Sequence, residues 1–166
     1  MNFTLGAALT NTGSITGGKG GSAGAGGAGG AGVSLLTGTL TNTGTITGGA
    51  GGIGTTTGGG GGAGVFLNGG TLITSGIISG SAGGSGAPKG APGDAVNFGT
   101  ATSTLIVDPA AVFNGQVVAN NLHDVLELAG TQSGGTPITL GTQFTNFATL
   151  DFASHAHWTP DANIAD

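Results

Sequence analysis

A phrase of about ten residues recurs three times along the chain, and each copy is followed by a glycine-rich run. It reads LTNTGSITGG from Leu9, LTNTGTITGG from Leu40 and, in a more diverged copy, LITSGIISGS from Leu72. The copies therefore begin 31 and then 32 residues apart, and the glycine-rich runs end in AGV, AGV and DAV at similar spacing. A fixed period of this size predicts a solenoid, in which each coil buries its apolar face against its neighbours.

The repeated phrase has the alternation of a β-strand. Residues 39–47 read TLTNTGTIT, with threonine at every second position and turn-forming residues from Asn42 to Gly44. We expect Leu40 and Ile46 to point inward and to stack on their equivalents, which are Leu9, Ile15, Leu72 and Ile78. The short apolar segments VSLL, VFL and VNF predict a second strand in each repeat. Because parallel pairing between coils satisfies the backbone groups, the predicted fold class is all-β, a parallel β-helix or β-solenoid.

The glycine-rich runs have a period of three. In the first run, one row of glycines occupies residues 18, 21, 24, 27 and 30, and a second row occupies residues 20, 26, 29 and 32. The third row holds the other side chains, which are Lys19, Ser22, Ala25, Ala28 and Ala31. Three residues per turn is the period of a polyproline II helix. Two interpretations stay open: polyproline II segments packed side by side, or flexible loops that protrude from the stack.

The amino-acid composition of the chain changes near residue 99. Residues 1–98 form the glycine-rich part, and residues 99–166 form a glycine-poorer continuation that reads as strands TSTLIVD, VFNGQVVA, DVLELAG, TPITL and FATLDFA. Five aromatic residues predict a denser core there: Phe113, Phe144, Phe147, Phe152 and Trp158. Since no linker intervenes, we expect one continuous solenoid.

Charge is scarce and unevenly placed. Charged residues make up 5% of the chain, against about 25% in an ordinary soluble domain. The net charge is −5, no acidic residue precedes Asp94, and the only basic residues are Lys19 and Lys89. This balance argues against nucleic acid and anionic membranes as partners. A surface of hydroxyls and amides favours a secreted chain, and the absence of cysteine means that strand stacking must supply the stability.

The two ends of the chain show no targeting or closing signal. The opening residues contain neither a basic region nor an apolar signal segment, and no run approaches the roughly 18 apolar residues of a membrane span. We therefore expect no membrane insertion of this segment, and we expect an excerpt of a longer protein.

Several stretches resemble a known family. TNTGTITGGAGG and GAGVFLNGGTLITSG resemble the repeat units of large bacterial autotransporter passenger domains. FNGQVVANNLHDVLELAG and LGTQFTNFATLDFASHAHW resemble the segment that often follows those repeats. The resemblance implies a right-handed parallel β-helix, displayed on the bacterial cell surface by a separate C-terminal β-barrel. Many relatives carry a calcium-binding GGxGxD turn where this chain reads ANNLHD at residues 119–124. With the glycines gone and one copy only, we expect no calcium there.

The residues with metal-binding or catalytic potential are few. His155 and His157 would share one face of a strand, with Asp151 or Asp161 as an oxygen ligand, but two histidines make a poor site and we favour exposed polar residues. The carboxylates are scattered: Asp108, Asp124, Glu127, Asp151 and Asp161. The chain has no arginine, no phosphate-binding loop and no GxSxG motif in a strand–turn–helix setting. We therefore expect a protein that is not an enzyme, with no catalytic residue, cofactor or metal.

The threonine rows are the candidate binding face. Thr10, Thr12, Ser14 and Thr16 align with Thr41, Thr43, Thr45 and Thr47, whereas Ile77 and Ile78 break the row in the third copy. The residues assigned to the face are Thr10, Thr12, Thr16, Thr41, Thr43, Thr45 and Thr47. We expect a structural or adhesive surface segment that contacts a glycan, a host surface or its own copies, end to end or side by side. An ice- or glycan-binding module and a phage tail-tip adhesin remain alternatives.

Overall fold

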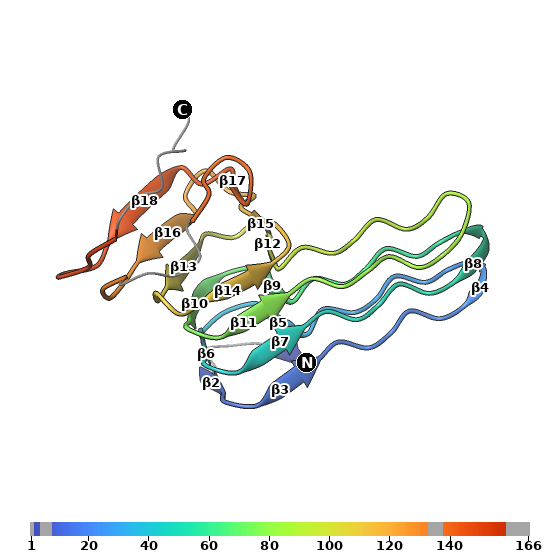
Figure 1. The fold of residues 1–166 in the computed structure, drawn as a ribbon, viewed down its shortest axis with the longest axis horizontal. Coiled ribbons are helices and arrows are strands. Elements are labelled where there is room, and N and C mark those ends of the chain that lie inside the picture. The colour runs from blue at the N-terminus through green and yellow to red at the C-terminus, as the bar shows by residue number, and fades with distance from the viewer. Residues whose placement is uncertain (1, 4–7, 133–137, 159–166) are drawn as a thin grey trace.

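The computed structural model describes residues 2–3, 8–132 and 138–158, and within them the regular elements are all β-strands in parallel sheets (Figure 1). Sheet A has the order β1 (Asn2–Phe3), β5 (Val33–Leu35), β9 (Val65–Leu67), β12 (Val96–Phe98), β15 (Val117–Val118) and β17 (Phe144–Thr145). Sheet B has the order β18 (Thr149–Phe152), β16 (Val125–Leu128), β13 (Ser103–Val107), β10 (Gly70–Thr74), β6 (Thr39–Asn42) and β2 (Ala8–Asn11). Sheet C has the order β14 (Val112–Asn114), β11 (Ile77–Ser79), β7 (Thr45–Thr47) and β3 (Ser14–Thr16), and sheet D pairs β4 (Ala23–Ala25) with β8 (Gly54–Thr57).

The chain winds as a parallel β-solenoid, as the repeat predicts. Each glycine-rich coil passes through sheet A, then sheet B, then sheet C, and equivalent residues of successive coils pair in register. Leu40 pairs with Leu9 on one side and Leu72 on the other, and Ile46 lies between Ile15 and Ile78. The side chains of Leu40 and Ile46 are fully buried, so the predicted aliphatic ladders are confirmed.

Residues 39–47 form two strands where one interrupted strand was expected. The chain turns a corner between β6 and β7, and the side chain of Asn42 is fully buried at this corner. At the corner a Cβ on Gly44 would lie 2.2 Å from the carbonyl oxygen of Gly13 in the preceding coil, so only glycine fits. Each glycine-rich coil therefore places three strands in the solenoid, not two.

A buried polar ladder lies at this corner. Asn11 donates from Nδ2 to Oδ1 of Asn42 (2.8 Å), and Asn42 donates from Nδ2 to the hydroxyl of Thr74 (3.2 Å). These three side chains are at most 6% exposed. Because a buried polar group is costly when it loses its partner, the ladder fixes the register of three coils.

Replacing Asn42 by alanine is expected to lower the free energy of unfolding by about 2 kcal/mol, since it leaves Asn11 and Thr74 without their ladder partner. Urea unfolding measures the loss. The control is Asn114→Ala, which removes an exposed amide that donates to Ser79 and should cost no more than about 0.5 kcal/mol. Equal losses in the two variants would contradict a special role for the ladder.

The three glycine-rich runs leave the solenoid as long hairpins and return to it (Figure 1). We name them arm 1 (residues 17–32), arm 2 (residues 48–64) and arm 3 (residues 80–95), and the layered unit that they form is the lamina. Hydrogen bonds between neighbouring arms recur at every third residue. Gly17, Gly20, Gly26 and Gly29 of arm 1 donate to carbonyls of residues 47, 50, 57 and 60. Gly48, Gly51, Gly58 and Gly61 repeat this pattern toward residues 79, 82, 88 and 91.

This period of three identifies the arms as packed polyproline II segments, so the flexible-loop interpretation is wrong. Both predicted glycine rows are used. In arm 2, a Cβ on Gly52 would lie 2.0 Å from the carbonyl oxygen of Gly21, and a Cβ on Gly51 would lie 2.0 Å from that of Gly59. Backbone therefore approaches backbone on two sides of each segment, and the third row carries the side chains along the flanks.

The solenoid continues beyond arm 3 without a further arm among the described residues. Between β14 and β15 a short turn at Gly115, with φ of 128°, takes the place that an arm has in the earlier coils. The expected strands TSTLIVD and DVLELAG are present as β13 and β16, and VFNGQVVA contains β14 and β15. For TPITL, Thr136 and Pro137 lie outside the described residues, and Leu140 makes only an isolated bridge to Phe144.

The aromatic core is present with one exception. Phe98 and Phe147 make an edge-to-face contact, as do Phe113 and Phe144, each with ring centroids 5.2 Å apart. Phe152 is 52% exposed, so its expected place in the core is wrong. It continues the ladder of Leu128, but β18 is the last strand of sheet B and no described residue covers this side chain.

Candidate functional site

The threonine rows lie where the sequence predicts. Thr10 pairs with Thr41, and Thr16 with Thr47, and all four side chains are at least partly exposed on the outer face of sheets B and C. Ser14 likewise pairs with Thr45. Thr12 and Thr43 are at the corners and are exposed, and the Thr43 hydroxyl donates to the carbonyl of Asn11 at 3.4 Å. The hydroxyl surface is therefore two coils wide at most of these positions.

The third coil interrupts some of the rows and continues others. Ile73 and Ile77 follow Thr41 and Thr45, whereas Ser79 follows Thr47. A further row that sequence analysis missed runs from Thr39 through Thr71 to Thr104, each partly exposed. The available signal was the threonine that directly precedes the inward leucine in all three strands.

The lamina provides the larger surface. Its two flanks carry the third-row side chains, and from the outgoing halves of the arms these are Lys19, Ser22, Ala50, Ile53, Ala82 and Ser85. Ile53 is 52% exposed near the tip of arm 2. Thr56, also at the tip, donates from its hydroxyl to the carbonyl of Gly24 at 2.7 Å, which ties two arms together. The flanks offer small apolar groups and hydroxyls with a single lysine.

A shallow groove of about 350 Å³ lies where the returning halves of the arms meet sheet A. Its larger side chains are Phe66, Pro92, Asp94 and Asn97, and small residues of the arms form the rest of the lining. Asn97 donates from Nδ2 to the carboxylate of Asp94 at 2.8 Å. The groove thus pairs an apolar wall with one amide–carboxylate pair, and it was not predicted because residues from three coils build it.

The two histidines do not share a strand face. His155 is in a turn with φ of 65°, and its Nδ1 lies 2.9 Å from the hydroxyl of Ser154. His157 forms a bridge with Thr131, and both imidazoles are exposed. Asp151 is on β18, whereas Asp161 lies outside the described residues. Among the described residues, no three His, Cys, Asp or Glu side chains gather closely enough to hold a metal ion.

The turn at residues 119–124 is organised by one buried carboxylate. Asp124 is fully buried and accepts three backbone N–H groups, from Ser103 (2.9 Å), Asn120 (3.1 Å) and Asn121 (2.9 Å). The carboxylate of Asp124 is thus bonded to this chain's own backbone. Of the other carboxylates in the described ranges, Asp108, Glu127 and Asp151 lie on sheet B or directly after β13, and Asp94 lies in arm 3 beside the groove.

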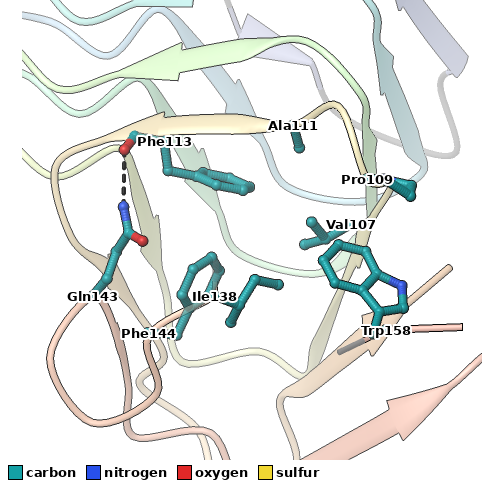
Figure 2. A pocket seen from close by; sticks show the side chains of 8 residues that line it. All are labelled: Val107, Pro109, Ala111, Phe113, Ile138, Gln143, Phe144 and Trp158. Atoms are coloured by element: carbon teal, nitrogen blue, oxygen red, sulfur yellow. Dashed lines mark hydrogen bonds between the residues drawn. The ribbon is translucent and has the colours of Figure 1, made fainter. Parts of the chain in front are cut away.

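The aromatic end of the core is tightly filled. Figure 2 shows Trp158, Ile138 and Phe144 facing Val107 and Phe113, and Gln143 donating from Nε2 to the carbonyl of Phe113 at 2.9 Å. The space left between these side chains is about 10 Å³, at the lower limit for one water molecule. Trp158 also donates from Nε1 to the carbonyl of Ala129 at 2.9 Å. This region is therefore packed core and has no room for a ligand.

Comparison with known proteins gives no guide to function, so the functional argument rests on the residues and the fold of this chain. No family model, no curated protein and no solved structure matched this chain. No helix in the described part of the chain is long and apolar enough to cross a membrane.

Proposed function

We propose that this chain is a segment of a non-enzymatic, cell-surface β-solenoid of the autotransporter passenger type, which presents its lamina and threonine rows for adhesion or self-association. The observation that carries the proposal is the lamina. Three arms project together from the solenoid, and hydrogen bonds between backbones hold them in one layered unit. Such a unit displays a wide, repetitive surface, whereas a catalytic site needs a closed pocket with convergent polar groups.

The chemistry of the surface supports weak contacts made many times. Hydroxyls of Thr10, Thr41, Thr16 and Thr47 repeat from coil to coil with the spacing of neighbouring strands, about 4.8 Å. Each such contact is weak alone, and several acting together raise the overall affinity by orders of magnitude. The sparse charge of the chain leaves hydroxyls, amides and apolar methyls as the contacting groups.

A glycan- or ice-binding module is the second candidate. The observation that favours it is the hydroxyl row formed by Thr16, Thr47 and Ser79, which stay in register across three coils. Glycan-array binding and thermal hysteresis separate this candidate from a purely structural role.

The test of the proposed function is a fourfold variant, Thr41→Ala, Thr43→Ala, Thr45→Ala and Thr47→Ala, displayed on cells. We expect adhesion of these cells to a glycan-coated surface to fall at least tenfold, because the variant removes the four threonine hydroxyls that the second coil contributes to the candidate binding face. The matched control is Thr142→Ala with Thr149→Ala, which removes two exposed threonines elsewhere. Unchanged adhesion and unchanged self-association in the fourfold variant would refute the assignment of the face.

A further inference from the structure

The glycine-rich coils repeat closely, so the positions at which one coil departs from the others can be located. On sheet A, the residues that pair in register are Ser34, Phe66 and Asn97. Three residues before each of them, the chain has Ala31, Ala63 and Asp94. The third coil therefore has a carboxylate where the first two have a methyl group, and the second coil has an aromatic ring between a serine and an asparagine.

These departures bring together side chains that are rare in the glycine-rich part of the chain. Asp94 is the only acidic residue among residues 1–98. In the described range 8–98 the aromatic side chains are Phe66 and Phe98, and Phe98 is 1% exposed in the core. Phe66, Asp94 and Asn97 all line the groove and are all partly exposed. One groove thus holds both the carboxylate and the accessible aromatic ring of this part of the molecule.

The groove lies inside the stack of coils. Phe66 is in β9, which lies between β5 and β12, and Asn97 is in β12, which lies between β9 and β15. Asp94 and Pro92 come from the returning half of arm 3, and arms 1 and 2 contribute glycine and alanine to the lining. Neighbouring strands on both sides therefore hold the ring of Phe66 and the amide of Asn97 in place.

The polar side of the groove has unused hydrogen-bonding capacity. Asn97 donates from Nδ2 to Oδ2 of Asp94 at 2.8 Å, which fixes the two side chains relative to each other. Oδ1 of Asp94 and Oδ1 of Asn97 accept no hydrogen bond from a described residue, and the second N–H of the Asn97 amide has no acceptor among them. The pair thus offers two acceptors and one donor. Neighbouring hydroxyl groups match this set, because each hydroxyl both donates and accepts.

The other side of the groove is apolar. Phe66 and Pro92 are its larger side chains, and glycine and alanine form the rest. The face of an aromatic ring is electrostatically negative, so it attracts C–H groups that lie flat against it. A ligand that fills this groove therefore needs a face of C–H groups and hydroxyls at its edge. The ring of a pyranose sugar has both.

The charge and the size of the groove restrict the kind of saccharide. Asp94 is the only charged residue that lines it, so an acidic sugar would be repelled and would find no cation in the lining to pair with. The volume of about 350 Å³ is near the low end of the range for ligand pockets, about 300–1,000 Å³. These properties suit a short, neutral part of a glycan better than a folded partner.

We propose that the groove binds a neutral hexopyranose residue of a glycan, with a C–H face of the sugar ring on Phe66 and adjacent hydroxyls on Asp94 and Asn97. The inference rests on the proposed function, because it names a class of ligand for adhesion. It assigns that ligand to sheet A and the arms, whereas the threonine rows lie on sheets B and C.

The repeat itself supplies variants that suit the fold. Phe66→Ser introduces the residue of the first coil, and Asp94→Ala introduces the residue of the first two coils. The probe is methyl β-glucoside, whose hydroxyls are all equatorial, so that both faces of its ring present C–H groups. It is titrated into isotope-labelled protein and followed by NMR. We expect the amides of Phe66, Asp94 and Asn97 to shift in the wild type, and each variant to raise the dissociation constant by about tenfold or more.

One control variant and one control ligand accompany this test. Ile53→Ser removes an apolar side chain that is 52% exposed and introduces the residue of the neighbouring arms, Ser22 and Ser85. Ile53 does not line the groove, so the dissociation constant should stay unchanged. Methyl β-glucuronide carries a carboxylate in place of the hydroxymethyl group of the glucoside. It should bind about tenfold more weakly or worse, because Asp94 repels it.

Three results would overturn the inference. The first is a wild type whose groove amides do not shift at about 100 mM methyl β-glucoside. The second is an equal dissociation constant in the wild type, Phe66→Ser and Asp94→Ala. The third is a groove that binds N-acetyl-lysine amide and not the glucoside, which would make it a site for a cationic peptide.

The inference and the proposed function can fail separately. If the glucoside does not bind but the fourfold threonine variant loses adhesion, only the sugar site in the groove is wrong. If the glucoside binds in the groove but the fourfold variant adheres and self-associates as before, the threonine face is wrong and the groove is the adhesive site.

Discussion

Replacing Gly52 by alanine is expected to lower the free energy of unfolding by about 3 kcal/mol. The new Cβ would lie 2.0 Å from the carbonyl oxygen of Gly21. That oxygen cannot move aside cheaply, because it accepts a hydrogen bond from Gly27, and Gly27 in turn accepts one from Gly52. The arms must separate to make room, so both the packing and these bonds are lost. Urea unfolding followed by circular dichroism measures the effect.

The matched control is Gly21→Ala. A Cβ on Gly21 meets nothing within 4 Å, so this variant should lose no stability. It should gain as much as about 0.5 kcal/mol, because alanine has fewer conformations to lose on folding than glycine. If the Gly52 and Gly21 variants are equally stable, the arms do not pack as described.

Replacing Asp124 by alanine is expected to have a comparably large effect, also about 3 kcal/mol on the free energy of unfolding. The change leaves three buried or partly buried N–H groups, those of Ser103, Asn120 and Asn121, without their acceptor. The bond to Ser103 also links the turn at residues 119–124 to the start of β13 in the preceding coil. Thermal unfolding of the variant measures the loss.

Asp151→Ala is the control for this prediction. Its carboxylate is exposed and accepts only the N–H of the next residue, Phe152. We therefore expect a change within about 0.5 kcal/mol. Added calcium should leave the melting temperature of the wild type unchanged, because the oxygens of Asp124 are already bonded to the backbone. A calcium-dependent rise in that temperature would contradict our interpretation of this turn.

The repeat period allows the register of the solenoid to be predicted, because identical residues at a fixed spacing stack when the coils stack. Leu9, Leu40 and Leu72 show this directly, and so do Ile15, Ile46 and Ile78. The position of the corner was harder to predict. Threonine alternates through residues 39–47 without a break, and only the burial of Asn42 reveals that the chain turns there.

The conformation of the glycine-rich runs could not be decided from one run alone. Glycine has little intrinsic preference for a single backbone conformation, so each arm depends on hydrogen bonds from its neighbours. The period of three indicated which rows would be packed, but not that acceptors would lie opposite the N–H groups of Gly20 and Gly51. Those acceptors come from residues about 30 positions away, and no pattern within a single run predicts that contact.

The candidate surfaces could likewise be predicted only in part from the sequence. The alignment of Thr10 with Thr41 follows from the period, whereas the groove beside Phe66 and the inward carboxylate of Asp124 depend on contacts between coils. A single Asp beside turn residues has the same appearance whether it faces solvent or backbone. Its environment becomes visible only in three dimensions.

Amide hydrogen exchange of arm 2 tests the lamina most directly. Gly49, Gly52, Gly59 and Gly62 donate to backbone carbonyls in the lamina, so their amides should exchange as slowly as those of β6 and β10 in the solenoid. The amide of Ala87, at the exposed tip of arm 3, makes no backbone hydrogen bond to a described residue and provides the fast reference. If the four glycines instead exchange at the rate of Ala87 while β6 and β10 stay protected, the arms are loose loops and the lamina does not exist.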